Sequence, residues 1–254
     1  MNTLQALIFD VDGTLAETER DGHRIAFNQA FADAGLDWHW DMPTYGRLLA
    51  ITGGKERLLA YWQEVDPQAA RGPDAAGLIA ELHRRKTAHY VRLVAEGGMA
   101  LRPGVRRLLL EARDAGLRLA IATTTTPDNV EALLRATLGA NGMAMFACIG
   151  AGDAVPRKKP DPGIYAWVLE RLRLDPQQCV AFEDSANGLR AALGSGLPTV
   201  ITTGSYTAGE AFPGALALLD GLGEPQAPAS GHVRQQAWTG CVDMATLQAW
   251  ISAV

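Results

Sequence analysis

Short apolar runs alternate with segments of helical periodicity along most of this chain. The runs have the length of buried strands and lie at residues 4–9, 119–122, 146–149, 179–182 and 199–201. Helical patterns lie between them at residues 105–115, 128–138, 162–172 and 187–193. Such an alternation is typical of a parallel sheet that is covered by helices on both faces. We therefore expect an α/β protein with a Rossmann-like, three-layer core.

One long segment interrupts this alternation, because residues 17–96 contain no convincing strand. Apolar side chains recur at helical spacing within residues 24–34, 56–64 and 75–94. We expect residues 17–96 to be an all-helical insertion, or cap, after the first strand. Its core should be formed by its own aromatic side chains, Phe27, Phe31, Trp38, Trp40, Tyr61 and Trp62. The core domain is then built from residues 1–16 and 97–254.

The last part of the chain has a weaker pattern. Residues 221–231 are rich in glycine, proline and alanine, which predicts a loop. Residues 244–252 have the apolar spacing of a helix that closes the core domain.

The composition excludes several classes of protein. With 48% hydrophobic and 20% charged residues, the chain resembles an ordinary soluble globular protein. A formal net charge of -5 argues against a nucleic-acid partner. No stretch approaches the roughly 18 apolar residues of a membrane span, and the first residues lack the features of a signal peptide. Three scattered cysteines disfavour a disulfide framework or a zinc site. We expect a cytoplasmic, monomeric protein that binds a small molecule.

Two acidic pairs follow predicted strands. Asp10 and Asp12 come after the first apolar run, and Glu183 and Asp184 come after a later one. In open α/β sheets, ligands bind at the carboxyl ends of the strands. Carboxylates gathered there repel one another unless a hard cation neutralises them, and oxygen ligands favour Mg²⁺. One acidic pair alone could equally be a helix cap or a solvated loop. An EF-hand loop is excluded, because residues 14–15 supply neither its next ligand nor its glycine.

Two further features suit an anionic substrate. Four consecutive threonines, residues 123–126, precede Pro127, and hydroxyl and amide groups at a helix start can cradle an anion. Lys159 is followed by two prolines within three residues, so it lies in a stiff turn where it suits a fixed charge on phosphate. The structural alternatives are a strand end with an N-cap and a solvated surface lysine. Lys158, its neighbour, is expected to face solvent.

The order of these features resembles the four motifs of the haloacid dehalogenase superfamily. In that order, DxDGT follows the first strand, Thr the second, Lys-Pro precedes a helix, and Glu-Asp follows a later strand. The resemblance covers about residues 4–203, and the helical insertion resembles the C1 cap of that family. Within the superfamily, the chain is most similar to the CbbY-type sugar-phosphate phosphatases at residues 12–23, 85–87, 159–162 and 183–188. The β-phosphoglucomutases are near relatives.

The resemblance implies a Mg²⁺-dependent phosphatase that forms an aspartyl-phosphate intermediate. Asp10 is then the nucleophile, and Asp12 is the general acid and base. Thr123 and Lys159 hold the phosphoryl oxygens. The implied metal ligands are the Asp10 carboxylate, the Asp12 backbone carbonyl, Glu183 and Asp184. Because haloacid dehalogenases lack the second acid of motif one, Asp12 argues for a C–O–P substrate.

The cap and its surroundings supply candidates for substrate recognition. Lys55 follows a glycine pair at a predicted helix start, and Lys86 lies in a basic segment. Both match positions that bind substrate in related sugar-phosphate enzymes. Glu17 suits sugar hydroxyl groups, and Thr124 adds a hydroxyl of its own. The structural alternatives are solvated lysines and a hinge or helix-start acid, and His23 is expected to be structural.

Two cap lysines and one phosphate site in the core suggest a substrate that is phosphorylated at both ends. The resemblance implies a ketopentose bisphosphate, most specifically xylulose 1,5-bisphosphate hydrolysed to xylulose 5-phosphate, and hence a link to carbon fixation in the Calvin cycle. Two alternatives stay open. A sugar-phosphate mutase is disfavoured by Glu17, where that group has Asp. A non-catalytic phosphate-binding regulator is disfavoured by the presence of both Asp10 and Asp12.

Overall fold

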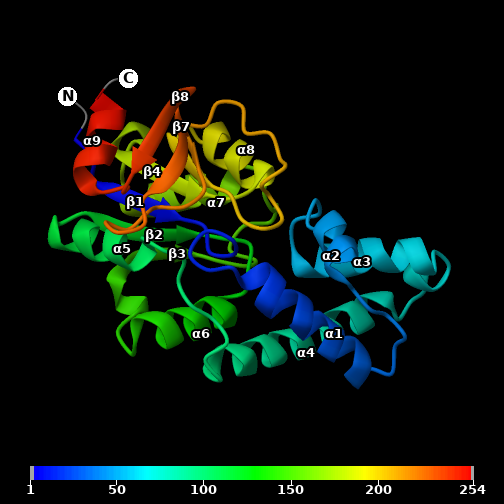
Figure 1. Cartoon of the computed structure of the whole chain (residues 1–254). Helices are drawn as coiled ribbons and strands as arrows, with labels where there is room; N and C mark the ends of the chain where they lie inside the picture. Colours follow the sequence, from blue (N-terminus) through cyan, green and yellow to red (C-terminus); the bar gives the residue numbers. More distant parts are fainter. Residues whose placement is uncertain (1–2, 253–254) are drawn as a thin grey trace.

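The apolar runs form the central strands of a single sheet in the computed structural model, which describes residues 3–252 (Figure 1). The eight strands lie in the order β3-β2-β1-β4-β5-β6-β7-β8. Their bounds are β1 Ala6–Phe9, β2 Arg118–Ala122, β3 Phe146–Gly150, β4 Cys179–Glu183, β5 Thr199–Thr202, β6 Ala217–Leu219, β7 Ala229–Val233 and β8 Gln236–Gly240. Strands β1 to β6 pair in parallel, while β7 and β8 add an antiparallel edge. The predicted α/β core is therefore confirmed.

Both faces of the sheet are buried, because successive side chains of a strand point to opposite sides. On β1, Leu7 and Phe9 pack in the layer of α5, α6 and α9, whereas Ala6 and Ile8 pack with α7 and α8. These helices are α5 Val105–Asp114, α6 Pro127–Leu138, α7 Gly163–Leu172, α8 Ala186–Gly194 and α9 Met244–Ser252. This is the expected three-layer arrangement, in which strands buried on both faces consist of continuous apolar runs.

The cap is helical and lies to one side of the sheet (Figure 1). Its helices are α1 Arg24–Asp33, α2 Met42–Leu48, α3 Gly54–Val65 and α4 Ala75–Ala95. The expected aromatic core is confirmed, because Phe27, Phe31, Trp40 and Trp62 belong to one buried cluster within the cap. Helix α4 also packs against core helix α6. Within residues 3–252, no helix combines the length and the apolar character needed to cross a bilayer.

Three strands and one helix were not expected from the sequence. The loop prediction is wrong at its end, because β7 begins at Ala229 and forms a hairpin with β8. The turn between them is made by Arg234 and Gln235, which both have positive φ without being glycine or asparagine, so the usual hairpin signal is absent. Helix α2 is only seven residues long and contains Gly46, a poor helix former in a helix interior. Strand β6, which pairs with β7, is only three residues long.

Candidate active site

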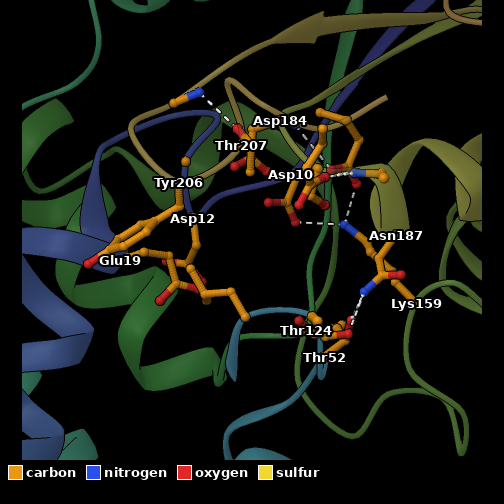
Figure 2. Close-up of a pocket in the computed structure, with 18 of the residues that line it drawn as sticks. Asp10, Asp12, Glu19, Thr52, Thr124, Lys159, Asp184, Asn187, Tyr206 and Thr207 are labelled. Carbon is orange, nitrogen blue, oxygen red and sulfur yellow. Dashed lines mark hydrogen bonds and ion pairs between the residues drawn. The ribbon is translucent and has the colours of Figure 1, made fainter. Parts of the chain in front are cut away.

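The predicted site residues converge at the carboxyl ends of three adjacent strands. Strand β1 lies between β2 and β4 in the sheet, so the residues that follow these strands share one edge. Asp10 follows β1, Thr123 follows β2, and Asp184 follows Glu183, the last residue of β4. Lys159 reaches the same point from the loop before α7. Figure 2 shows Asp10, Asp184 and Lys159 around a common pocket.

Lys159 is the buried counter-charge of the carboxylates. Its Nζ lies 2.6 Å from Asp10 Oδ1, 2.6 Å from Glu183 Oε1 and 2.8 Å from the carbonyl oxygen of Ala122. All three charged side chains are buried. Burial by itself disfavours the ammonium form, but Asp10 and Glu183 outweigh it and raise the pKa of Lys159 above its usual range. Lys159 is therefore a fixed positive charge beside Asp10, as the sequence predicts.

The three carboxylates suit a hard divalent cation. Asp10, Glu183 and Asp184 each offer an oxygen, and these oxygens lie within 4.8 Å of one another. Burial raises the pKa of Asp10 to about 7, although Lys159 opposes this shift, and Glu183 and Asp12 add to it. Burial, then Asp10 and Glu183, also raise the pKa of Asp184 well above its usual range. Such a crowded oxygen set is relieved by a cation, and the chemistry of its donors fits Mg²⁺.

Two glycines make room for this cluster. A Cβ atom at Gly13 would lie 2.1 Å from Asp184 Oδ2, and one at Gly188 would lie 1.9 Å from Glu183 Oε2. Gly13 also has a φ of 82°, which other residues rarely adopt. The glycines of DxDGT and of the Glu-Asp motif therefore allow the backbone to approach the carboxylates. This close approach explains why glycine is needed at both positions.

The Asp12 carboxylate binds the first turns of the cap. Its Oδ1 accepts a hydrogen bond of 2.5 Å from Thr18 Oγ1 and lies 2.9 Å from His23 Nε2. Burial by itself would raise the pKa of Asp12, but the charge and hydrogen bond of His23 and the hydrogen bond from Thr18 lower it. His23 therefore contacts the expected acid–base residue, a role that sequence reasoning missed. The available signal was the placement of a hydroxyl and a histidine just after motif one.

A cavity of about 220 Å³ lies between core and cap. We call it the front pocket. From the core it is lined by Asp10, Asp12, Thr123, Thr124, Lys159, Glu183, Asp184, Asn187, Arg190 and part of the loop from Gly204 to Glu210. From the cap it is lined by Glu17, Glu19, Leu49, Ala50, Thr52 and Arg57. The expected core residues thus share one cavity, and of the expected cap residues Glu17 is among them.

Sequence reasoning missed a buried polar group in the cap wall of this pocket. Tyr45 donates a hydrogen bond to the Glu19 carboxylate, and Arg57 Nη1 donates to the Tyr45 hydroxyl at 2.9 Å. Arg57 Nη1 also lies 3.9 Å from Glu19 Oε2. The available signal was Glu19, an acidic residue shortly after motif one.

The remaining expected cap residues lie outside the front pocket. Lys55 Nζ contacts Asp153 Oδ2 of the core at 3.2 Å. Lys86 is buried beside the rings of Phe27 and Tyr90, and burial lowers its pKa to about 8, although Asp12 opposes this. Both lysines line smaller cavities next to the front pocket.

A side chain of the core is hydrogen-bonded to the cap. Asn187 Nδ2 of α8 donates to the carbonyl oxygen of Ala50 and to Thr52 Oγ1, both at 3.0 Å (Figure 2).

The expectation that Lys158 faces solvent is wrong. Its side chain is only 14% exposed, because Nζ binds the Gly152 carbonyl oxygen and Asp153, both at 2.6 Å.

A family profile described as haloacid dehalogenase-like hydrolase matches residues 4–196. The plasmid-encoded protein CbbY of Cupriavidus necator is 53% identical over 97% of this chain and 96% of that protein. Crystal structures of CbbY from Rhodobacter sphaeroides are 50% identical and cover 86% of this chain and 95% of theirs. The complex with phosphate has a TM-score of 0.79, and the D10N mutant with xylulose-(1,5)bisphosphate has one of 0.80.

These matches extend over both the core and the cap, and they agree with the site that the strand ends bring together. The resemblance that the four sequence motifs predicted is confirmed. The chain belongs to the haloacid dehalogenase-like hydrolases, among the CbbY-type proteins, and is a phosphoric monoester hydrolase.

Proposed function

We propose that this protein is a Mg²⁺-dependent phosphatase that hydrolyses a sugar bisphosphate, most specifically xylulose 1,5-bisphosphate, through an aspartyl-phosphate intermediate. The observation that carries this proposal is the buried contact of Lys159 with Asp10 at the rim where Glu183 and Asp184 also lie. A nucleophile, a fixed cation and a cation site stand within one pocket. The xylulose-(1,5)bisphosphate bound to a relative that is 50% identical supports the substrate class.

The residues of this chain have distinct tasks in the proposed reaction. Asp10 attacks phosphorus, and the bond from phosphorus to the sugar oxygen breaks as Asp12 gives that oxygen a proton. In the second half, water attacks the aspartyl phosphate, Asp12 takes back a proton, and phosphate leaves. Lys159 and Thr123 hold the phosphoryl oxygens and counter the charge that spreads over them in the transition state.

Asp10, the backbone carbonyl of Asp12, Glu183 and Asp184 are the groups that would hold Mg²⁺. When bound, the ion neutralises these carboxylates and the phosphoryl oxygens. Negative charges outnumber positive ones in a pocket that contains a phosphate dianion and three carboxylates. Both Lys159 and the metal are therefore needed to admit the substrate.

Phosphate release tests this proposal directly. The purified protein should release inorganic phosphate from xylulose 1,5-bisphosphate in the presence of Mg²⁺. Excess chelator should reduce the rate at least about 100-fold, because a phosphate-stabilising cation supplies several kcal/mol to the transition state. Sugar monophosphates and a small aryl phosphate complete the panel. Undiminished release in chelator would refute the metal requirement, and return of the phosphoryl group to sugar would support a mutase instead.

We propose that Arg190 binds the distal phosphate of the substrate. It lines the front pocket from α8, is exposed, and donates to Asn187, which in turn binds the cap loop at Ala50 and Thr52. Arg57, the other arginine that lines this pocket, is buried and already bound to Tyr45 and to cap carbonyl groups. Arg190 is thus the arginine of this pocket that can turn to a second phosphate.

Arg190→Ala should raise the KM for the bisphosphate about 10- to 100-fold, because a hydrogen bond between charged groups contributes roughly 1.5–3 kcal/mol. Hydrolysis of the small aryl phosphate, which has no distal phosphate, should stay close to the wild-type rate. Lys55→Ala is the matched comparison, since its ammonium pairs with Asp153 outside the front pocket. A selective loss of bisphosphate use in Lys55→Ala, with none in Arg190→Ala, would assign the distal phosphate to Lys55.

A further inference from the structure

A smaller cavity adjoins the front pocket at Asp12 and Thr124. We call it the rear chamber, and its lining includes Asp12, His23, His83, Lys86, Thr126 and Asn129. Its volume is about 40 Å³. Since one buried water needs roughly 10–15 Å³, the chamber has room for about three waters and not for a sugar phosphate.

A third cavity lies next to the rear chamber and is lined in part by exposed residues. It shares Gly54, His83 and Thr126 with the rear chamber and has a volume of about 100 Å³. At its other end it is lined by Lys55 and Asp153, whose side chains are 48% and 75% exposed. The three cavities therefore lie next to one another between cap and core, with exposed residues at one and the Asp12 carboxylate at another.

Buried polar atoms along this series lack partners within the protein. His23 Nδ1, Thr126 Oγ1 and Asn129 Oδ1 have no hydrogen-bond partner among residues 3–252, and His23 and Asn129 are only 3% and 1% exposed. Buried polar groups in native proteins are almost always paired, either with protein or with ordered water. The space and the polar atoms both fit water.

His23 links the chamber to the acid–base residue. Its Nε2 lies 2.9 Å from Asp12 Oδ1, and a carboxylate can only accept, so Nε2 carries the proton in that contact. The other ring nitrogen, Nδ1, is then left for a molecule in the chamber. Water can serve it as donor or as acceptor.

We propose that the rear chamber and the third cavity form a water passage that delivers the hydrolytic water to Asp12 while the dephosphorylated sugar still occupies the front pocket. This inference rests on the proposed aspartyl-phosphate mechanism. The water oxygen bonds to phosphorus, the bond between phosphorus and the Asp10 oxygen breaks, and the water proton passes to Asp12. Asp10 regains its carboxylate, and the step needs no other reactant.

Two substitutions disturb the passage without touching the carboxylates, one by removing a polar partner for water and one by narrowing the space. Asn129→Leu replaces a buried amide of the chamber wall with an apolar group of similar size. Gly54→Ala adds a Cβ atom 2.7 Å from His83 Nε2, at the junction of the two cavities. Gly77→Ala is the matched control, because this exposed helical glycine has no atom within 4 Å of the added Cβ.

The test measures the two half-reactions separately. Each protein is mixed with xylulose 1,5-bisphosphate that carries ³²P in both phosphates, in the presence of Mg²⁺, and quenched in acid, and the formation and the decay of labelled protein are followed. We expect decay to slow at least about fivefold in Asn129→Leu and Gly54→Ala, with formation unchanged, because only the second half-reaction consumes water. Gly77→Ala should match the wild type in both.

Each other outcome has a defined meaning. A wild-type protein that never becomes labelled refutes the proposed function itself. Labelled protein that decays at the wild-type rate in both chamber variants refutes only the water passage, and so does an equal slowing of formation and decay. If one variant fails to fold, which thermal unfolding reveals, the other decides. A high-resolution crystal structure of the wild type should show water bonded to His23 Nδ1 and Asn129 Oδ1, and a dry chamber would overturn the inference.

Discussion

Asp10→Asn should abolish phosphate release, with a loss of at least about 10⁴-fold on every substrate, because the amide cannot form the covalent intermediate. The neighbouring carboxylates do not replace it. Glu183 accepts hydrogen bonds from Lys159 and Tyr165, at 2.6 Å and 2.5 Å. The measurement is steady-state phosphate release from the bisphosphate and from the aryl phosphate, together with the acid-stable label on the protein.

The same substitution should leave the fold intact. Burial holds the pKa of Asp10 at about 7 in the absence of a metal ion, so a neutral amide of the same shape relieves repulsion among the carboxylates. The melting temperature is therefore not expected to fall. Asp128→Asn, the same change at an exposed position in α6, serves as control. Activity within tenfold of wild type in Asp10→Asn would place the nucleophile elsewhere.

Lys159→Ala should lose about 10³-fold in kcat, because a fixed cation on the transferring phosphoryl group is one of the main sources of catalysis in phosphoryl transfer. It should also be less stable by about 3–5 kcal/mol, the usual effect of removing one partner from a buried charged pair. The structural reason is that both Asp10 and Glu183 lose a counter-charge 2.6 Å away.

Mg²⁺ should restore part of the lost stability, since it supplies a positive charge to the same carboxylates. The measurement is urea unfolding and thermal melting of Lys159→Ala with and without Mg²⁺, beside phosphate release. Lys158→Ala is the adjacent control, because its partner Asp153 is 75% exposed and such pairs contribute about 0–1 kcal/mol. Equal stability of Lys159→Ala and Lys158→Ala would contradict the role of Lys159 as the buried counter-charge.

The core of the site could be predicted from the sequence because of a topological rule. Residues that end parallel strands or directly follow them meet at one edge of the sheet, whatever their distance along the chain. Asp10 and Glu183 are 173 positions apart, yet both contact Lys159 Nζ at 2.6 Å. Short motifs at strand ends therefore report a three-dimensional arrangement.

The cap wall of the site could not be predicted in the same way. Lys55 and Lys86 are basic in the sequence, but one pairs with Asp153 and the other is buried beside aromatic rings. Arg57 and Glu19 line the front pocket, which their residue types alone do not reveal. Which side chains a helical cap directs toward the core depends on how its helices pack, and no strand-end rule applies there.

The sequence by itself determined the α/β core, the helical insertion, and the carboxylates and lysine that meet in the candidate site, because periodicity and order along the chain specify these features. Only the tertiary structure decided that His23 and Thr18 bind Asp12, that Lys158 is tied to Asp153, and that a hairpin extends the sheet. The contacts of Asp12 depend on the packing of cap against core, that of Lys158 on the path of the loop before α7, and the hairpin on a turn without glycine or asparagine. Packing of this kind is set by shape and burial over the whole molecule, and no local pattern of residues encodes it.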